Sequence, residues 1–376
     1  MRFSDALIRT FSNCAKKILS LAVKNSSKLG FSLAYPYFCR GINLHHTMNA
    51  NKRTIAIVAG GDSGEYEVSL RSAAGIGSFL DKERYIVYTV IIRGTDWHVQ
   101  LPDGTTAPID RNDFSFTHEG HHVTFDYAYI TIHGTPGENG LLGSYFELIR
   151  MPYSTCPPLI SAMTFNKFVL NQYLRSLGVR VAESLTLRRQ DVITVDDVVK
   201  AVGLPCFVKP TCGGSSCATT KVKTPEELLP AVEAAFGEAD EVMIEAFMQG
   251  TEITCGCYKT RTKSVVFPIT EVVAKNEFFD YDAKYNGQVE EITPARIDES
   301  IAERVRTLTS LLYDILRCHG IIRIDYIITE GNKLNLLEIN TTPGMTATSF
   351  IPQQVRAAGL DIKEVLTEII EESFEN

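Results

Sequence analysis

Two runs of isoleucine and leucine near the carboxyl end of the 376-residue sequence are interrupted by four polar residues: Arg323, Asp325, Glu338 and Asn340. Charged groups are costly to bury unless they are paired, hydrogen-bonded or bound to a metal. Two carboxylates and an amide oxygen are hard ligands of the kind that Mg²⁺ prefers, and Mg²⁺ usually binds together with phosphate oxygens. The alternative is a structural salt-bridge cluster around the arginine. A metal site here would require a nucleotide site elsewhere in the sequence.

The dipeptide Gly331-Asn332 between these runs is suited to a two-residue hairpin turn, which sets the expected strand register. In that register three pairs of residues are opposite each other: Asp325 and Glu338, Arg323 and Asn340, and Glu330 and Lys333. Period-two alternation then places the four polar side chains on one face. Directly opposed carboxylates repel each other, so a cation is expected between them. A shift of the register by one residue would turn the two carboxylates to opposite faces.

Two further segments have the composition of a nucleotide site. Residues 208–218, "VKPTCGGSSCA", place Lys209 at a strand end before a glycine- and serine-rich loop, whose backbone N–H groups can bind phosphate oxygens. The loop lacks the GxxxxGK[ST] order of a Walker motif, and an ordinary flexible loop is the alternative. Glu245 and Glu252 could bind an adenine amino group and ribose hydroxyls, although singly they also fit exposed acids.

Residues 276–288, "NEFFDYDAKYNGQ", are aromatic and charged but have no helix or strand periodicity. Long irregular loops of this kind often close over active sites. Lys284 and Tyr285 are the residues in this loop that we expect to contact a substrate. An exposed loop with anchoring aromatic residues is the alternative.

The elements that must position these residues follow from the hydrophobic pattern. Three β-branched runs, at 54–61, 85–92 and 127–134, alternate with helical patterns and predict a parallel α/β domain. Ligands of such domains bind beyond the carboxyl ends of the strands, where Gly60-Gly61 and His133-Gly134 lie.

A second α/β unit is predicted to follow this domain. It comprises an amphipathic helix at 164–178, strands at 204–210 and 241–248, and a helix that begins with a capping box of Thr224 and Glu227. The polar hairpin and a C-terminal helix at 361–373 complete the chain.

The composition narrows the class of protein. The formal net charge is −8 and the pI is near 5.6, and the absence of basic runs argues against nucleic acid as the main partner. No apolar run approaches the ~18 residues of a membrane span. Nine cysteines without CxxC spacing fit reduced thiols in a cytosolic protein.

The first 47 residues differ from the rest, because they carry seven Lys or Arg residues and one Asp. They lack the long apolar core and cleavage site of a secretory signal. A helix on a membrane surface would fit, but we interpret residues 1–48 as a disordered extension or an artefact of the assigned start, with the true start at Met48. A chain that begins at Met48 should then be as active as the full chain, and lower activity or expression would contradict this interpretation.

Taken in order, the motifs resemble the D-alanine–D-alanine ligase family of ATP-grasp enzymes. The specific motifs are "HGTPGENGLLG" at 133–143 and the hairpin "GIIRIDYIIT" with "LLEINTTPGM"; they are joined by "GGDSGEYEVSL", "FVKP", "GGSS", "IEAFMQGTE" and "DYDAKYNG". The resemblance covers roughly residues 52–372. It implies an α/β and α+β architecture, in which an ATP-grasp fold follows an N-terminal parallel, Rossmann-like substrate domain. The expected boundaries are 49–155 for the substrate domain, 156–245 for the central ATP-grasp subdomain, and 246–376 for the C-terminal ATP-grasp subdomain with the metal hairpin and the lid loop.

The resemblance implies a reaction in which ATP and two D-alanines give D-alanyl-D-alanine, ADP and phosphate. The carboxylate of the first D-alanine attacks the γ-phosphate to form an acylphosphate, and the amine of the second D-alanine displaces phosphate. The implied setting is peptidoglycan precursor synthesis in the cytoplasm. The implied protein is a homodimer that binds D-alanine and ATP, binds no nucleic acid and has no membrane span.

The resemblance also assigns roles to residues of this sequence. Two ions of Mg²⁺ or Mn²⁺ would be held by three ligands: Asp325, Glu338 and Asn340. ATP would be bound by six residues: Lys167, Lys209, Ser216, Glu245, Glu252 and Lys284. The catalytic group would comprise Glu65, Ser215, Tyr285, Arg323, Gly344 and Ser349. The substrate pocket would include His133 and Phe350.

Within the catalytic group, Glu65 would bind the ammonium of the first D-alanine and join a network with Ser215 and Tyr285. Read without the resemblance, Glu65 is an acid at a helix start, which favours the helix dipole, and His133 equally fits a turn cap. Arg323 and the backbone N–H of Gly344 would stabilise the oxyanion of the tetrahedral intermediate. Ser349 and Phe350 would form the carboxylate pocket of the second D-alanine.

The sequence departs from the family pattern in places. The phosphate loop reads "TCGGSSCA" where relatives often carry charged residues before the glycine and a glycine after the serines, which bears on loop mobility and ATP affinity. Asn166 replaces an acid, with little expected effect. Tyrosine at position 285 is the residue associated with dipeptide synthesis in the family, so D-lactate is disfavoured as the second substrate. The alternatives are a same-fold ligase that uses D-serine or D-lactate, and a non-catalytic ATP-grasp module, which would be expected to lack Arg323 or a metal ligand.

Overall fold

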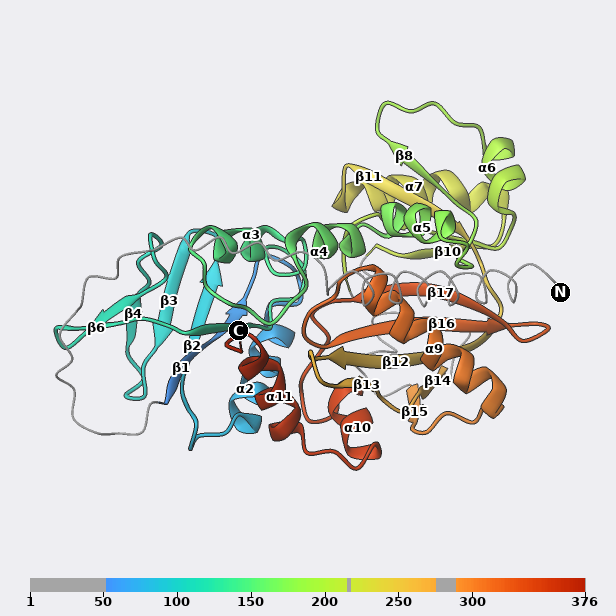
Figure 1. Cartoon of the computed structure of the whole chain (residues 1–376). Helices are drawn as coiled ribbons and strands as arrows, with labels where there is room; N and C mark the ends of the chain where they lie inside the picture. Colours follow the sequence, from blue (N-terminus) through green and yellow to red (C-terminus); the bar gives the residue numbers. More distant parts are fainter. Residues whose placement is uncertain (1–51, 215–217, 275–288, 376) are drawn as a thin grey trace, which may run out of the picture. The chain divides into compact units, whose positions relative to one another are not determined.

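The structure is a computed structural model that describes residues 52–214, 218–274 and 289–375 (Figure 1). The basic extension at 1–48 lies outside these ranges, and so do four of the predicted site residues: Ser215, Ser216, Lys284 and Tyr285. The chain from Asn51 to Asn376 belongs to one compact unit.

The N-terminal part contains a five-stranded sheet in the order β4-β3-β2-β1-β7. The elements of this part are β1 (Arg53–Gly60), α2 (Tyr66–Phe79), β2 (Tyr85–Arg93), β3 (Asp96–Gln100), β4 (Thr106–Pro108), β5 (Phe116–His118), β6 (His121–Val123), β7 (Tyr127–Ile130) and α3 (Leu141–Leu148). β1 pairs in parallel with β2 and β7, as predicted. β3 and β4 add an antiparallel edge that the sequence pattern did not predict.

The parallel register brings the carboxyl ends of β1 and β7 to the same edge of this sheet. The two segments that follow are joined there, because Asp62 N–H donates to the carbonyl of Thr135 (2.9 Å) and Ser63 Oγ donates to that of His133 (2.8 Å). The loops that carry Glu65 and His133 therefore lie side by side.

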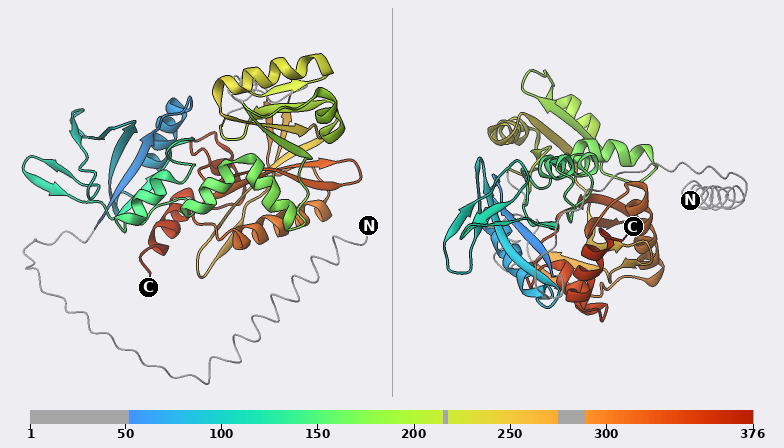
Figure 2. Two further views of the ribbon diagram at one scale, coloured as in Figure 1. Left: turned by 90° about the horizontal axis from the view of Figure 1, so that it is seen from above. Right: turned by 60° about the vertical axis from the view of Figure 1, so that its left-hand side comes forward.

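The middle part forms a four-stranded sheet in the order β10-β9-β11-β8, in which every pairing is antiparallel. Its elements are α4 (Pro158–Phe165), α5 (Lys167–Ser176), β8 (Ser184–Arg188), α6 (Val195–Val202), β9 (Cys206–Pro210), β10 (Thr220–Val222), α7 (Pro225–Glu238) and β11 (Glu241–Ala246). Apolar side chains of α6 and α7 pack on one face of the sheet and form a common core (Figures 1 and 2). The other face is left for the cavity described below.

The prediction of a single helix at 164–178 is wrong in one respect. The segment contains the end of α4 and the whole of α5, and these two helices meet at Asn166. Asn166 has extended backbone angles, and its side chain accepts a hydrogen bond from the N–H of Val169 (3.0 Å). An asparagine cap of this kind starts a new helix at the next residue, which makes Lys167 the first residue of α5. The capping box of Thr224 and Glu227 at the start of α7 is confirmed.

The C-terminal part contains an antiparallel sheet in the order β15-β14-β12-β16-β17, with β13 paired to β12. Its elements are β12 (Gly250–Lys259), β13 (Ser264–Val266), β14 (Thr270–Ala274), β15 (Val289–Ile292), α9 (Glu299–Ile315), β16 (Ile322–Thr329), β17 (Lys333–Asn340), α10 (Phe350–Ala357) and α11 (Ile362–Glu372). β16 lies in the interior of the sheet, so both of its edges are hydrogen-bonded.

The hairpin of β16 and β17 confirms which polar residues are opposite each other, but its turn is longer than the predicted two-residue turn. Asp325 is opposite Glu338 and Arg323 is opposite Asn340, as predicted. Thr329, however, pairs with Lys333, so the prediction that Glu330 faces Lys333 is wrong. The loop has three residues because Glu330 joins the turn, and an irregularity between Asp325 and Tyr326 restores the register by leaving one extra residue on β17.

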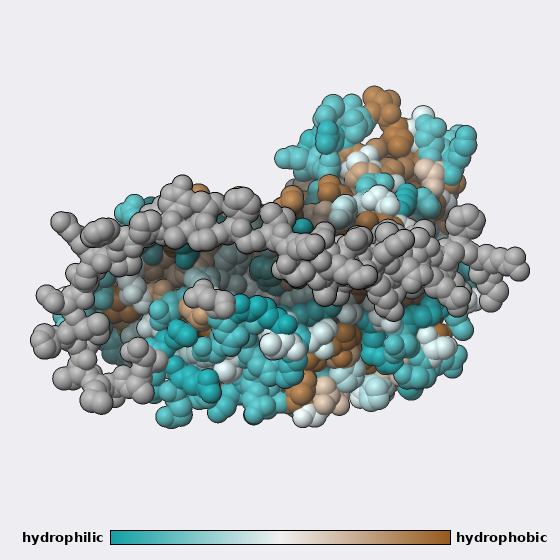
Figure 3. Space-filling model, in the orientation of Figure 1, coloured by the Kyte–Doolittle hydropathy of each residue, from teal (hydrophilic) through white to brown (hydrophobic). Residues whose placement is uncertain are grey.

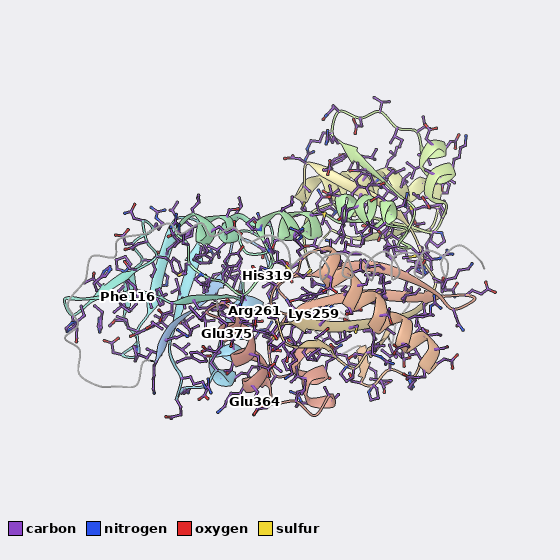
Figure 4. The ribbon with its side chains drawn as sticks, viewed as in Figure 1. Phe116, Lys259, Arg261, His319, Glu364 and Glu375 are labelled. Carbon is purple, nitrogen blue, oxygen red and sulfur yellow. The ribbon has the colours of Figure 1, made fainter. Side chains whose placement is uncertain are left out.

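Helix α11 connects the N-terminal sheet to the C-terminal sheet through its carboxylates. Glu371 accepts hydrogen bonds from Arg53 (3.2 Å) and from the hydroxyl of Tyr85 (2.8 Å). On the other side, Arg261 lies within 3.5 Å of Glu372 and 3.7 Å of Glu375 (Figure 4). These contacts fix the sheet that positions Glu65 against the sheet that carries the polar hairpin.

Hydrophilic residues form most of the described surface around α11 on the face shown in Figure 3, whereas hydrophobic and intermediate residues are also visible at α10. None of the helices in the described ranges is long and apolar enough to cross a membrane.

Candidate active site

One cavity of about 1330 Å³ is lined by segments of the N-terminal, middle and C-terminal parts. Every predicted site residue within the described ranges lines it: Glu65, His133, Lys167, Lys209, Glu245, Glu252, Arg323, Asp325, Glu338, Asn340, Gly344, Ser349 and Phe350. These residues lie far apart in the sequence. The fold therefore brings to one place the side chains that sequence reasoning had singled out separately, while their individual roles stay predictions.

The C-terminal sheet presents one face to this cavity because opposed residues on antiparallel strands project to the same side. Glu252 on β12 is opposite Ile327, and Thr254 is opposite Asp325. Asp325 is in turn opposite Glu338 on β17. A polar row of Thr254, Asp325 and Glu338 thus runs across three neighbouring strands, and Glu252 lies two residues along β12 on the same face.

Arg323 and Asp325 form a buried, two-pronged ion pair at the centre of that face. Arg323 Nε donates to Asp325 Oδ1 (2.9 Å) and Nη2 to Oδ2 (2.7 Å), and both residues are 8% exposed. Nη2 also lies 3.7 Å from Glu338 Oε1. Burial disfavours the charge of Arg323, but the carboxylates outweigh it, so the pKa of the guanidinium is raised and it stays protonated.

Asn340 links the two carboxylates on the same face. Its Nδ2 donates to Asp325 Oδ2 (3.3 Å) and to Glu338 Oε1 (3.1 Å), and Thr254 Oγ1 donates to Asp325 Oδ1 (2.5 Å). The structural salt bridge that the sequence left as an alternative is therefore present. It leaves Glu338, the more exposed of the two carboxylates, facing the cavity.

The donor set of this face fits a hard divalent cation. Within the described ranges no three His, Cys, Asp or Glu side chains converge on one point, so a cation here would be bound by two carboxylates, the Asn340 amide and ligands that the protein does not supply. Mg²⁺ binds in this way, through one or two carboxylates plus phosphate oxygens and water. Zinc would require nitrogen or sulfur ligands, which the face lacks.

The two lysines predicted to bind phosphate lie at the edge of the glycine-rich loop. Lys167 Nζ donates to the carbonyl of Gly213 (2.5 Å), and its N–H donates to the carbonyl of Thr211 (2.9 Å). Burial lowers the pKa of Lys167. Lys209 forms an ion pair with Glu245 on the neighbouring strand β11. Because Asn166 caps α5, Lys167 is the first residue of this helix and lies in contact with the glycine-rich loop.

Glu65 reaches the same loop from the N-terminal sheet. It is the N-cap of α2, and a Cβ atom at Gly214 would lie 2.1 Å from its Oε2. A larger residue at position 214 would therefore require the Glu65 carboxylate to move from its present place. Residue 215, the predicted partner of Glu65, follows this glycine in the chain but lies outside the described ranges.

His133 and Glu138 come from the loop after β7. His133 is buried, and the N–H of Gly134 donates to Glu138 Oε2 (2.7 Å). The pKa of Glu138 is raised to about 7, mainly by burial; the Gly134 N–H opposes the shift, and the nearby Glu65 contributes to it. Glu138 was not among the predicted residues, even though it lies within the quoted "HGTPGENGLLG" segment.

The raised pKa of Glu138 predicts a specific pH dependence of stability. Between its ordinary value near 4.5 and about 7, the folded chain holds a proton that the unfolded chain has released. The free energy of unfolding should therefore fall as the pH rises through this window and level off above it, by about 3 kcal/mol in total. Glu138→Gln keeps an acceptor for Gly134 but cannot titrate, so it should remove this fall.

Urea unfolding at pH 5, 6, 7 and 8 measures the effect. The matched control is Glu364→Gln, at an exposed glutamate of α11 outside the cavity (Figure 4), and it should follow the pH profile of the wild type. Parallel pH profiles for the wild type and Glu138→Gln would show that Glu138 does not titrate in this range.

The segment before α10 closes the end of the cavity next to Arg323. Ser349 is the N-cap of α10, and its Oγ lies 2.8 Å from Thr346 Oγ1. A Cβ atom at Gly344 would lie 3.0 Å from Ser349 Oγ. The guanidinium of Arg323 lies over the ring of Phe350, at 5.3 Å from its centroid. Gly344, Ser349 and Phe350 therefore border the space in front of Arg323.

Several further residues line the cavity that sequence reasoning missed: Val68, Arg71, Glu138, Thr254 and Glu291. Val68 and Arg71 follow Glu65 at helical spacing, so a helical projection from Glu65 would have found them. Thr254 would have followed from the pairing of β12 with the hairpin. No local signal identifies Glu291, which reaches the cavity only through the edge strand β15.

The arrangement has the parts needed for phosphoryl transfer onto a carboxylate. Lysines at a glycine-rich loop and an acidic, oxygen-rich face can hold a metal-bound triphosphate. A buried guanidinium beside a polar helix start can stabilise negative charge that develops next to it.

Comparison with known proteins gives a consistent result. Two sequence profiles match the chain, "D-ala D-ala ligase N-terminus" over residues 54–156 and "D-ala D-ala ligase C-terminus" over residues 173–371. A D-alanine–D-alanine ligase from Phocaeicola vulgatus is 70% identical over 323 residues, which are 86% of this chain and 100% of the relative. One from Bacteroides fragilis is 67% identical over the same proportions.

Solved structures resemble the fold at lower identity. A D-alanyl-alanine synthetase A from Vibrio cholerae has a TM-score of 0.78 at 29% identity, and the match covers 86% of this chain and 99% of that one. The VanG D-Ala:D-Ser ligase from Enterococcus faecalis has a TM-score of 0.75 at 28% identity, covering 86% and 100%. Together with the site geometry and the two profiles, these matches place the chain in the D-alanine–D-alanine ligase family.

Proposed function

We propose that this protein ligates two D-alanines to D-alanyl-D-alanine, using ATP and passing through a D-alanyl phosphate, in the synthesis of peptidoglycan precursors. The observation that carries the proposal is the single cavity, in which the acidic hairpin face and the lysines of the phosphate loop meet Glu65 and Ser349. Relatives named as D-alanine–D-alanine ligases at 67–70% identity support the same reaction.

For the first half-reaction, Lys167 and Lys209 bind the phosphates of ATP, and Glu245 and Glu252 bind its adenosine. Asp325, Glu338 and Asn340 would hold two Mg²⁺ or Mn²⁺ ions, which would supply positive charge against the triphosphate. Lys209 is paired with Glu245 and both residues line the cavity, so ATP binding would move the ammonium group from that carboxylate to a phosphate.

The second half-reaction takes place in front of the buried guanidinium. Arg323 and the N–H of Gly344 stabilise the oxyanion that forms when the second amine attacks the acylphosphate. Glu65 binds the ammonium of the first D-alanine, with His133 beside it. Ser349 and Phe350 hold the carboxylate of the second D-alanine.

Further parts of the proposal concern residues outside the described ranges and the setting of the protein. Ser215 and Tyr285 complete a network with Glu65, and Ser216 and Lys284 contact ATP. The boundaries at residues 155 and 245 separate a substrate domain from two ATP-grasp subdomains, in keeping with the three main sheets. The protein works as a cytoplasmic homodimer.

A ligase that uses D-serine as the second substrate is the alternative with a specific observation in its favour. The VanG ligase shares the fold, so the fold does not separate the two activities. The higher identity to D-alanine–D-alanine ligases favours D-alanine.

The decisive experiment measures ADP release by the full chain with D-alanine alone and with D-alanine plus D-serine or D-lactate, and identifies the products by mass spectrometry. D-alanyl-D-alanine should be the main product in every mixture. A mixed product in excess of it would establish the alternative, and ATP binding without any product would indicate a non-catalytic module.

A further inference from the structure

Helix α2 presents a stripe of three side chains to the cavity: Glu65, Val68 and Arg71. Residues three apart on a helix project on the same side, so the stripe follows from the sequence once Glu65 is placed at the start of α2. It has a carboxylate at one end, an apolar side chain in the middle and a guanidinium at the other end. The proposed function uses only the carboxylate.

The part of α2 that carries Ser72 and Gly75 packs against the segment that precedes α10. A Cβ atom at Gly75 would lie 2.2 Å from the carbonyl oxygen of Met345, and Met345 N–H donates to Ser72 Oγ (3.4 Å). Arg71 is the neighbour of Ser72 and lines the cavity together with Thr346 and Ser349. Arg71 therefore belongs to the end of the cavity where the second amino acid is expected.

Arg71 differs from Arg323 and Lys209 in having no ion pair with an acidic residue among the described residues. Five Lys or Arg residues of the described ranges line the cavity: Arg71, Lys167, Lys209, Lys221 and Arg323. Arg323 is paired with Asp325, and Lys209 with Glu245. Lys167 donates to the Gly213 carbonyl, and Lys221 lies over the ring of Phe247, 3.8 Å from its centroid. Arg71, Lys167 and Lys221 can therefore take a new anion without breaking an ion pair that the structure shows among the described residues, and of these three Arg71 is the one on helix α2, next to the segment that precedes α10.

The spacing of the stripe fits a dipeptide. Arg71 follows Glu65 by six positions, which corresponds to about 9 Å along a helix axis between the two backbone positions. Two extended residues span at most about 7 Å, so a dipeptide has a length of the same order as the stripe, and the two long side chains can bend toward its ends. A zwitterion of two residues can therefore place its ammonium at Glu65 and its carboxylate at Arg71, with a side chain against Val68.

We propose that Arg71 binds the carboxylate of the second amino acid, and hence of the dipeptide product, and that it selects acceptors which carry this carboxylate. Guanidinium groups match carboxylates through two parallel hydrogen bonds. Ser349 and Phe350 at the start of α10 offer hydrogen bonds but no positive side chain, so Arg71 supplies the charge that the acceptor end otherwise lacks. This inference rests on the proposed ligase activity.

The test is a competition between two acceptors. The full chain is incubated with ATP, D-alanine and D-alaninamide, which has an amine but no carboxylate and can serve only as an acceptor. Mass spectrometry then gives the ratio of D-alanyl-D-alanine to D-alanyl-D-alaninamide. The wild type should favour the acid at least tenfold, and Arg71→Ala should lower this ratio at least fivefold. Arg71→Lys, which keeps the charge, should retain most of the preference.

Kinetics separate this role from a general defect. Arg71→Ala should raise the KM of the second D-alanine at least tenfold, with little change in the KM of ATP. Arg84→Ala removes an exposed arginine just after α2 that does not line the cavity, so it is the matched control and should behave as the wild type.

The outcomes are distinguishable. If the wild type forms neither product, the proposed function fails and the inference about Arg71 fails with it. If the wild type forms both products and Arg71→Ala keeps the same ratio, the ligase activity stands and the inference about Arg71 is wrong. Equal losses of both products in Arg71→Ala, with an unchanged ratio and a lower Tm, would assign Arg71 a purely structural role.

Discussion

Replacement of Glu338 by glutamine should lower D-alanine-dependent ADP release by about 100-fold or more, the scale on which lost charge stabilisation reduces turnover. Glutamine keeps the shape of the side chain and can still accept the hydrogen bond from Asn340. It removes the negative charge, however, and Asp325 alone, already engaged by Arg323, Thr254 and Asn340, cannot replace it as a cation ligand.

The fold should survive this change, because Glu338 is the more exposed of the two carboxylates. Glu330→Gln is the matched control, since Glu330 lies in the loop of the same hairpin, is exposed and does not line the cavity. The measurements are coupled-enzyme ADP release at several Mg²⁺ concentrations and thermal unfolding. Near-normal turnover of Glu338→Gln would refute the metal assignment.

Replacement of Arg323 by lysine should lower kcat by about 100-fold while retaining a positive charge. The guanidinium makes two hydrogen bonds to Asp325 and lies over Phe350 at the same time. An ammonium group is a point donor on a flexible chain and cannot reproduce this planar arrangement. The developing oxyanion would then lose a fixed donor.

Stability should fall as well, by about 1–3 kcal/mol, because Asp325 is buried and loses part of its hydrogen bonding. Lysine is preferred to alanine here, since alanine would leave a buried carboxylate without its cation and the chain could fail to fold. Arg304→Lys is the control, at an exposed arginine that donates to the carbonyl of Asn332 in the hairpin loop. If kcat of Arg323→Lys stays within threefold of the wild type, Arg323 is structural and the oxyanion role is wrong.

The hairpin shows how far sequence reasoning reaches and where it stops. Alternation with a period of two is a property of any strand, so the shared face of Asp325 and Glu338 followed from their positions. The three-residue loop and the compensating irregularity did not, since both depend on how β16 is held between β12 and β17. The predicted pairs of Asp325 with Glu338 and of Arg323 with Asn340 were right because these two departures cancel, whereas the pair of Glu330 with Lys333 lies between them and was wrong.

The helix break at Asn166 illustrates the same limit. The apolar pattern at 164–178 continues through this residue, and pattern alone predicts one helix. The isolated bridge between Asn166 and Cys212, together with the Lys167 N–H bond to Thr211, fixes the chain against the phosphate loop. Tertiary contacts therefore overrode a pattern that was locally consistent with helix.

The sequence by itself determined the chemistry of the cavity: an oxygen-rich acidic face, a phosphate loop with its lysines, and the family to which their order belongs. These properties follow from residue types and local periodicity, both of which can be determined from the sequence alone. Only the tertiary structure decided that Glu65 touches the loop at Gly214 and that Arg71 lines the same cavity as Ser349. It also decided that Glu138 is buried, which raises the pKa of its carboxyl group toward neutral pH. Burial and proximity between distant segments set these properties, and no local pattern encodes them.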